Sequence, residues 1–309
     1  MPAMGQPSRL STEGDVQLEA TSGAGKNIAP TRTERDENFP VASRLIAPRH
    51  RAPILAFYRF ARAADDIADH PTLKPEAKLD GLAALEAGLV GAGEGDPRAL
   101  ALRQALAERN LSSRHALDLL AAFRLDVIKS RYRDWGELMG YCALSAAPVG
   151  RFVLDVHGEP PDRWPASDAI CASLQVINHL QDCGQDFARL DRVYLPLDTL
   201  DRFHASLADL QAPKASEALR AAIGELTRRA RLLLEEGAFL PGAVKDLRLA
   251  CEIGAIVGLA RANCARLERR DPLSERVHPT KATFAATGLI GAVAGARAYA
   301  VGAWRSNSQ

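Results

Sequence analysis

The pattern that most constrains this chain is the near absence of strand signals. No run of β-branched residues alternates with polar ones, and no Asn-Gly pair marks a hairpin. Apolar residues instead recur at helical spacing, as in Leu79, Leu82, Leu85 and Leu89. The sequence therefore predicts an all-α fold of about ten helices in one domain, with no repeat of fixed period.

The composition fits a globular protein with a sizeable core. The 309 residues are 47% hydrophobic and 25% charged, with a formal net charge of +1. This near-neutral charge gives no support for nucleic-acid binding. The five cysteines show no Cys-x-x-Cys spacing and are interpreted as core residues in a reducing compartment. The start of the chain lacks a secretory signal pattern, which favours a cytoplasmic protein.

Three parts are predicted along the chain. Residues 1–34 are rich in Gly, Ser, Thr and Ala without apolar periodicity, and we expect a disordered tail. Residues 35–280 are expected to form the helical domain, and residues 281–309 an apolar helix with a short tail. Residues 282–304 are long and apolar enough to span a bilayer. Their glycines and Arg297 favour a helix packed on the domain. Contact with the inner face of the cytoplasmic membrane is the second interpretation, and a span is the third.

The individual helices are predicted from apolar periodicity and from proline and glycine breaks. Ser113 is expected to cap one helix, Pro148 to kink another, and residues 189–196 to form an irregular loop. The predicted helical ranges are 52–70, 76–92, 100–108, 113–130, 134–157, 165–187, 214–238 and 241–270.

An acidic cluster ends the first predicted helix. Asp65 and Asp69 are four residues apart, so they point to the same side, and Arg62 precedes them by three. Two like charges at this spacing destabilise a helix unless a cation lies between them. A divalent cation such as Mg²⁺ would remove the repulsion, and Mg²⁺ usually also takes substrate phosphates as ligands.

A second polar stripe lies within residues 174–187. Asn178, Asp182 and Asp186 are spaced by four, beside an apolar stripe on the same helix. Burying an amide and carboxylates without partners is costly. Two such helices facing each other would form a cage of carboxylates suited to a Mg²⁺-diphosphate.

These clusters resemble the two aspartate-rich motifs of the squalene/phytoene synthase family. Arg62–Asp69 is similar to the first motif and Asn178–Asp186 to the second. Arg192–Pro196 and Tyr141–Gly150 resemble two further family segments, in the family's order, and the likeness covers about residues 35–270. Within the family, the resemblance is closest to the bacterial hydroxysqualene synthases of hopanoid pathways. Three stretches carry it: Glu37–Ser43, Ala122–Val127 and Ser145–Arg151.

The resemblance implies an isoprenoid synthase fold with helices around a central apolar cavity. It also implies Mg²⁺-dependent ionisation of presqualene diphosphate and capture of the cation by water, giving hydroxysqualene. Other enzymes of the hopanoid pathway are implied as partners. The metal ligands implied are Asp65, Asp69, Asn178, Asp182 and Asp186. The substrate contacts implied are Arg62, Arg192, Asn38 and Gln181. The catalytic residues implied are Tyr141, Tyr194, Arg62 and Arg192.

Alternatives remain open for the function and for single residues. The chain could instead condense two prenyl diphosphates as a squalene, presqualene diphosphate or phytoene synthase. A non-enzymatic helical scaffold would carry its acidic stripes toward solvent. Arg62 and Arg192 could pair with neighbouring aspartates, and the two tyrosines could be core residues with satisfied hydroxyls. Asn38 could cap the first helical region.

Overall fold

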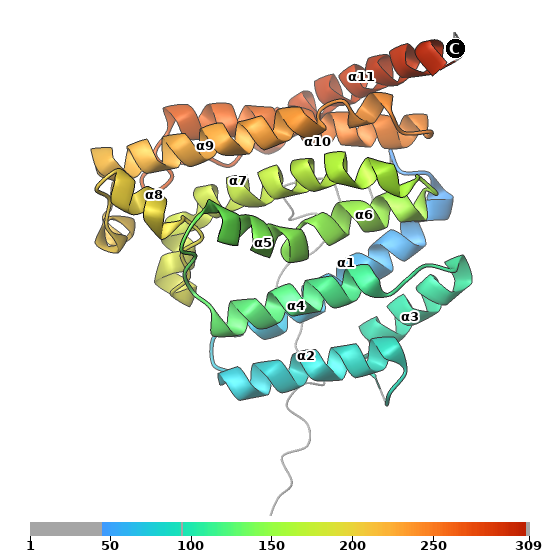
Figure 1. Cartoon of the computed structure of the whole chain (residues 1–309), viewed down its shortest axis with the longest axis horizontal. Helices are drawn as coiled ribbons and strands as arrows, with labels where there is room; N and C mark the ends of the chain where they lie inside the picture. Colours follow the sequence, from blue (N-terminus) through green and yellow to red (C-terminus); the bar gives the residue numbers. More distant parts are fainter. Residues whose placement is uncertain (1–44, 94, 307–309) are drawn as a thin grey trace, which may run out of the picture.

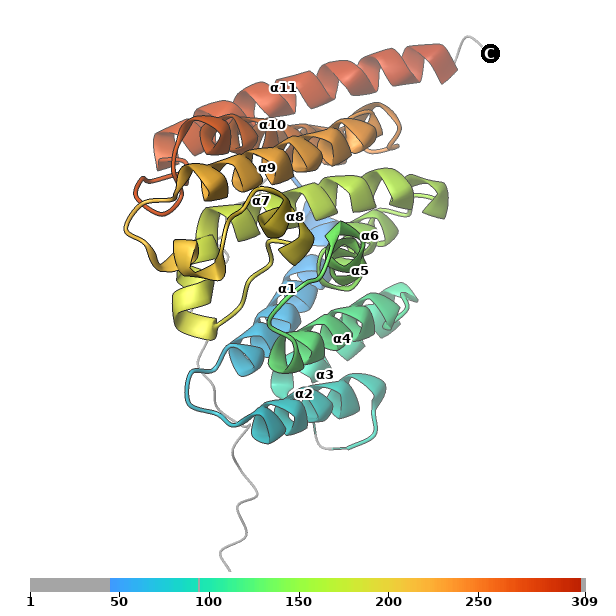
Figure 2. The same ribbon diagram turned by 60° about the vertical axis from the view of Figure 1, so that its left-hand side comes forward.

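A computed structural model describes residues 45–93 and 95–306, with side chains as far as Trp304 (Figures 1 and 2). The predicted tail at residues 1–34 lies outside the described residues. So do the predicted substrate contact Asn38 and the stretch Glu37–Ser43 that contains it.

Helices form all of the regular secondary structure in the described residues, which confirms the predicted all-α class. A single isolated bridge pairs Arg131 with Val193. The α-helices are α1 (Pro48–Ala68), α2 (Pro75–Val90), α3 (Pro97–Arg109), α4 (Arg114–Ile128), α5 (Trp135–Ser145), α6 (Ala147–Val156), α7 (Trp164–Leu190), α8 (Leu197–Arg202), α9 (Glu217–Gly237), α10 (Leu247–Arg269) and α11 (Lys281–Ser306). The 3₁₀ segments are η1 (Pro161–Arg163), η2 (Leu207–Gln211) and η3 (Leu240–Gly242).

The helix α1 begins at Pro48, before the predicted start at residue 52. Proline suits a first helical turn because the N–H there has no intrahelical acceptor. Pro53 lies further inside the helix and cannot donate to the carbonyl of Arg49. That carbonyl instead accepts a hydrogen bond from the Arg109 guanidinium of α3. A contact between helices thus replaces the backbone bond that Pro53 removes.

Two local predictions were wrong. The helix expected to kink at Pro148 is two helices, α5 and α6, separated at Ala146. Pro148 lies in the first turn of α6, where its missing N–H costs no intrahelical bond. Ser113 precedes α4, but its side chain makes no capping bond. The N–H of Arg114 donates instead to Ser112 Oγ at 3.1 Å.

Two apolar clusters hold the helices together. One contains the buried faces of α1 to α4, including the predicted leucines Leu82, Leu85 and Leu89 of α2. The other gathers side chains of α5, α7, α9 and α10. The short helix α6 supplies both, because Phe152 belongs to the first cluster and Leu154 to the second. Ala122 of α4 also belongs to the second cluster, so the molecule is built as two cores joined through α6 and α4.

The helix α11 lies at one edge of the molecule and packs along α10 (Figures 1 and 2). Glycines form this contact: a Cβ on Gly295 would come within 2.2 Å of the Ala250 carbonyl oxygen, and one on Gly254 within 2.4 Å of the Gly291 oxygen. Only glycine permits backbones to approach this closely. The contact therefore fixes which side of α11 faces α10.

Candidate active site

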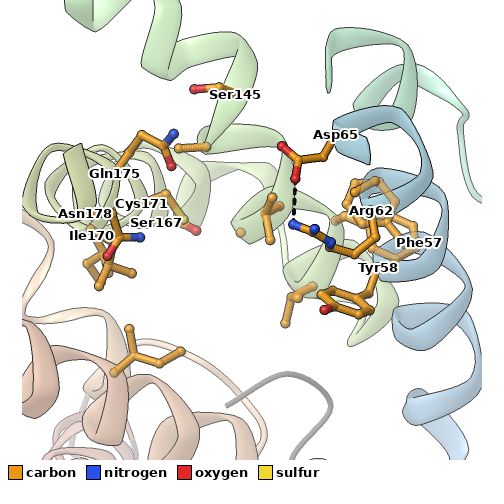
Figure 3. A pocket seen from close by; sticks show the side chains of 18 of the residues that line it. Phe57, Tyr58, Arg62, Asp65, Ser145, Ser167, Ile170, Cys171, Gln175 and Asn178 are labelled. Carbon is orange, nitrogen blue, oxygen red and sulfur yellow. Dashed lines mark hydrogen bonds and ion pairs between the residues drawn. The ribbon is translucent and has the colours of Figure 1, made fainter. Parts of the chain in front are cut away.

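A cavity of about 420 Å³ lies where the two apolar clusters meet. Figure 3 shows Phe57, Arg62 and Asp65 of α1 on one side of this space, with Gln175 and Asn178 of α7 across from them. Much of the lining is apolar, for example Phe57, Phe152, Ile170, Leu174 and Ile253. The helices α1 and α7, which carry the two acidic motifs, thus form opposite walls of one cavity.

One end of the cavity is acidic. Asp65 stands in the last turn of α1, Asp69 is the residue that caps this helix, and Asp186 lies near the end of α7. Most apolar lining residues of the same two helices come earlier in each, for example Phe57 and Ile170, and Leu190 is an exception. The cavity is therefore acidic toward the C-terminal ends of α1 and α7 and apolar toward their beginnings.

The carboxylates at this end repel one another. Burial, together with the charge of Asp69, raises the pKa of Asp65 to about 7, although Arg62 opposes this. Burial also raises the pKa of Asp186 to about 7, with Asp182 and Asp69 adding to the effect. Asp69 of α1 acts on a carboxylate of each helix, so the two motifs lie within electrostatic reach of each other. A bound cation would relieve this repulsion.

Both predicted arginines line the cavity, and both are paired with aspartates. Arg62 Nη1 lies 2.6 Å from Asp65 Oδ2, and Nη2 lies 3.0 Å from Asp66 Oδ1. The Arg192 guanidinium is buried, with Nη1 at 2.5 Å from Asp69 Oδ1. It also donates to the backbone carbonyls of Asp126 and Ala68. The arginines thus hold the α1 carboxylates in place, and a diphosphate would have to share these guanidinium groups with them.

Asp126 is a cavity carboxylate that sequence reasoning did not assign. It lies on α4 and accepts hydrogen bonds from Tyr141 Oη at 2.8 Å and from Tyr194 Oη at 2.9 Å. Burial raises its pKa to about 6, although Arg192 and the two tyrosines oppose this. Its sequence signal is a carboxylate three residues after Phe123, beside the predicted core face of its helix.

The predicted catalytic tyrosines converge on this aspartate. Burial raises the pKa of both Tyr141 and Tyr194 well above the usual range, so both hydroxyls stay protonated and donate. Both rings also line the cavity. The hydroxyls are therefore satisfied as in a core tyrosine, and both residues still border the cavity.

Only some of the other predicted α7 residues line the cavity. Asn178 lines the cavity, whereas Gln181 and Asp182 are absent from its lining. Gln181 is buried, and its side-chain amide has no hydrogen-bond partner among the described residues. Asp182 Oδ1 lies 2.9 Å from His278 Nε2. Of the predicted polar stripe of α7, Asn178 and Asp186 therefore line the cavity and Asp182 does not.

His179 stacks on the Tyr194 ring, with the ring centroids 3.6 Å apart. Burial lowers its pKa to about 3, and the nearby Arg192 charge adds to this. The imidazole is therefore neutral at physiological pH and adds no positive charge to the cavity.

The donor set of the acidic end suits a hard cation such as Mg²⁺. Among residues 45–93 and 95–306, no group of three or more His, Cys, Asp and Glu side chains is arranged to hold one metal ion by itself. Mg²⁺ usually binds through one or two carboxylates plus substrate phosphates and water. Oxygen ligands on facing walls, Asp65 and Asp69 on one and Asp186 and Asn178 on the other, fit that mode.

Comparison with known proteins identifies a family. Residues 32–283 match the family described as Squalene/phytoene synthase. This range contains every predicted site residue, including Asn38 outside the described part of the chain.

The names of individual relatives are more specific than the family description. The chain is 56% identical over 247 residues to a hydroxysqualene synthase of Rhodopseudomonas palustris, covering 80% of this chain and 85% of that protein. It is 51% identical over 284 residues to a hydroxysqualene synthase of Sinorhizobium fredii, covering 91% and 97%. It also resembles the crystal structure of squalene synthase HpnC from Alicyclobacillus acidocaldarius. That likeness has a TM-score of 0.68 and 34% identity, and covers 77% of this chain and 90% of the other.

Proposed function

Because the chain belongs to the squalene/phytoene synthase family, we propose that it converts presqualene diphosphate and water into hydroxysqualene and diphosphate. The observation that supports this reaction most is the identity of 56% and 51% to hydroxysqualene synthases, each over most of both chains. The facing acidic motifs and the apolar cavity supply a place where such a reaction could occur.

The proposed diphosphate site is the acidic end of the cavity. Asp65, Asp69, Asn178 and Asp186 would hold Mg²⁺ there, and Asp182 would assist from beside Asp186. Bound Mg²⁺ would offset the negative charge that develops on the departing diphosphate. The carboxylates themselves disfavour an unaccompanied anion, so the site would select a diphosphate that arrives together with metal.

Arg62 and Arg192 are the proposed diphosphate contacts from the protein. Both arginines line the cavity, and each guanidinium contacts a carboxylate of the first acidic motif. The planar fork of arginine can bind two oxygens at once and stays charged throughout. Their contribution would grow as the carbon–oxygen bond breaks, because the leaving group then gains charge. Asn38 and Gln181 stay predicted substrate contacts.

The apolar part of the cavity would protect the carbocation. Side chains such as Phe57, Phe152 and Leu174 exclude bulk water, which otherwise would react with the cation before it rearranges. Tyr141 would place an aromatic ring near positive charge at the border of the acidic end, whereas the Tyr194 ring is stacked on His179 and Tyr132. The Tyr141 and Tyr194 hydroxyls are held by Asp126, which would fix these rings in one orientation.

The reaction balances with water as the only co-reactant. The carbon–oxygen bond to diphosphate breaks, the cyclopropylcarbinyl cation rearranges, and a water oxygen bonds to carbon. One water proton is then released. No hydride donor is required, so we expect turnover without NADPH.

The test is incubation of the purified chain with presqualene diphosphate and Mg²⁺ in oxygen-18 water without NADPH. Hydroxysqualene carrying the label is expected, because its oxygen comes from solvent. A chelator added to a parallel reaction should abolish the product. An unlabelled hydroxyl would overturn water capture, and efficient formation of presqualene diphosphate from farnesyl diphosphate would assign the chain to the preceding condensation.

Squalene formation is the second candidate, because the similar crystal structure from Alicyclobacillus acidocaldarius is described as a squalene synthase. This reaction would need a hydride donor in place of water. Repeating the incubation with NADPH separates the two. Squalene produced only when NADPH is present would favour this candidate, whereas an unchanged rate and product would exclude it.

A further inference from the structure

The outward face of α11 is apolar along most of its length. Among the side chains pointing away from α10, Leu289 is 67% exposed, Ile290 71% and Val293 54%. Toward the end of the helix, Val301 is 51% and Trp304 71% exposed. Alanines fill most of the positions between them, and Arg297 is the only charged residue on this face from Ala285 to Trp304. An exposed apolar surface of this extent marks an interaction site.

The neighbouring helix α9 shows the ordinary arrangement. Its exposed positions include Arg228, Glu235 and Glu236, and its apolar residues turn into the core. A surface helix normally places charged residues toward solvent in this way. The exposed Leu232 of α9 stands among charged neighbours, so it does not form a continuous surface. The apolar outer face of α11 is therefore a local property of this helix.

The orientation of this face is fixed by the glycine contact with α10. Gly291 and Gly295 bring the two backbones together, and Ala298 and Gly302 pack against Gly242 of η3. Rotating α11 to bury Leu289 and Ile290 would turn larger side chains into a space that accepts only glycine. The apolar side chains thus cannot fold back onto the protein and stay directed outward.

Charge and aromatic content indicate what covers the face. From Lys281 to the end of the chain the sequence contains Lys281, Arg297 and Arg305 but no Asp or Glu. Trp304 stands at the exposed end of the helix. Tryptophan is enriched where apolar and aqueous regions of a membrane meet, and basic residues are attracted to anionic lipid headgroups. The combination of apolar side chains with only positive charge complements an anionic lipid surface.

The apolar surface continues beyond α11 and lies close to the cavity. Phe239, 61% exposed, borders a shallow depression with Arg297 and Val301. The adjacent η3 contributes Leu240 to the cavity lining, and α10 contributes Ile253 and Ile256. The elements that carry α11 on one side thus form part of the cavity wall on the other.

We propose that the outer face of α11, with Phe239, docks the protein on the surface of an anionic lipid bilayer. By length and composition, Lys281–Trp304 could cross a membrane, and 17% of an apolar 18-residue window within it is buried in the protein. Surface docking uses the exposed apolar side chains while keeping the glycine contact with α10, whereas a span would separate the two helices. Docking does not depend on the proposed reaction, because it involves no residue of the acidic end.

The experiment measures binding of the full chain to vesicles by flotation, without substrate or Mg²⁺. Vesicles of phosphatidylcholine with phosphatidylglycerol are compared with vesicles of phosphatidylcholine alone. The wild type should bind the anionic vesicles, and more weakly the neutral ones. The triple variant Leu289→Gln, Ile290→Gln, Val293→Gln should bind at least roughly 100-fold more weakly, because three apolar side chains leave the lipid.

The matched control is Leu232→Gln, which changes a comparably exposed leucine on α9 and should leave binding unchanged. The triple variant should keep its helical content and its turnover of a detergent-dispersed substrate. Wild-type protein that does not float overturns the proposal, as does a triple variant that binds like the wild type. A wild-type dimer that the triple variant converts to a monomer, without a change in vesicle binding, would instead assign the face to a second copy.

Extraction from bacterial membranes distinguishes docking from a span. Surface docking predicts release of the protein by an alkaline carbonate wash. Retention through this wash, with release only by detergent, would overturn docking in favour of insertion of α11.

Discussion

Asp65, Asp126 and Asp186 are carboxylates held within a cavity, whereas Leu289, Ile290 and Trp304 are apolar side chains held out in water. Each region reverses the usual distribution of side chains, in which charge is exposed and apolar groups are buried. Burial and neighbouring carboxylates raise the pKa of Asp65 and Asp186 to about 7, which shows that keeping these carboxylates ionised in the cavity costs free energy. The second costs unfavourable hydration of apolar surface.

The difference between the regions lies in how the protein keeps them. Arginines hold Asp65 and Asp69, and two tyrosines hold Asp126, so polar bonds help to fix this end of the cavity. The apolar face of α11 is held from behind by glycine contacts with α10. Both arrangements are stable only as parts of a larger fold, and both fit a partner from outside the chain: a cation with diphosphate in the first region and lipid in the second.

The largest expected effect is on turnover, from Asp186→Asn. We expect kcat/KM to fall by about three orders of magnitude, because the neutral amide would bind a metal–diphosphate far less well. Stability should not fall, because no ion pair joins Asp186 to another side chain in the described part of the chain and neutralising it relieves repulsion from Asp182 and Asp69. Steady-state kinetics and thermal unfolding measure the two quantities.

The control for this prediction is Asp162→Asn, which changes a surface aspartate whose side chain is 67% exposed. It should alter neither turnover nor stability. Full activity in Asp186→Asn would remove this residue from the metal site, and a large loss of stability would show that the carboxylate is structural.

Replacing Arg192 by lysine should reduce kcat/KM by about 100-fold, although the charge is kept. The guanidinium contacts Asp69, Asp126 and Ala68 at once, and an ammonium group cannot reproduce this planar arrangement. Arg228→Lys, on the exposed side of α9, is the matched control and should be neutral. If Arg192→Lys lowers the melting temperature but leaves the kinetics of the folded enzyme unchanged, the arginine is only a structural ion-pair partner.

The glycine contact behind α11 can be tested with a pair of glycines on the same helix. Gly295→Ala should destabilise the protein by about 2 kcal/mol, because its Cβ would meet the Ala250 carbonyl oxygen at 2.2 Å. A Cβ on Gly288 would meet nothing within 4 Å, so Gly288→Ala should be neutral or stabilise by up to about 1 kcal/mol. Chemical denaturation compares them, and equal effects of the two changes would contradict the close packing.

The smallest effect concerns the ordinary charged surface of α9. Hydrogen bonds from Arg228, with those from Arg229 and Arg202, lower the pKa of Glu225 to about 2. The stability from this ionised group is present above the unfolded pKa of about 4.3 and is lost as pH falls through about 2. Glu225→Gln should therefore cost under about 1 kcal/mol at pH near 7, because the group is solvent-screened. The cost should vanish toward pH near 2, and a cost independent of pH would point to packing instead.

The sequence predicted the fold class, the family and the two helices that carry the acidic motifs. It did so because apolar residues recur at helical spacing and because carboxylates four apart lie on one side of a helix, both of which are local properties. An ion pair of Arg192 with a neighbouring aspartate was an open alternative, but the observed partner, Asp69, is far away in the chain and was not predicted.

Other features depend on the tertiary structure. Asp126 has no second acid at helical spacing in its own segment, and its importance appears only when Tyr141 and Tyr194 approach it from other elements. The division of residues 134–157 into α5 and α6 depends on how both helices pack. The exposed side of α11 could not be predicted from a sequence of alanines and glycines, because these residues are compatible with either environment.

The position of α6 between the two cores has a consequence for the motion and folding of the molecule. Phe152 and Leu154 are held by different apolar clusters, while the cavity runs between those clusters. Small relative shifts of the two halves would change the width of the cavity without exposing either core. Each half is also a natural cooperative unit for hydrogen exchange, with α6 as the segment whose protection depends on both. The width available to a long flexible ligand would then depend on how firmly α6, together with α4, couples the halves.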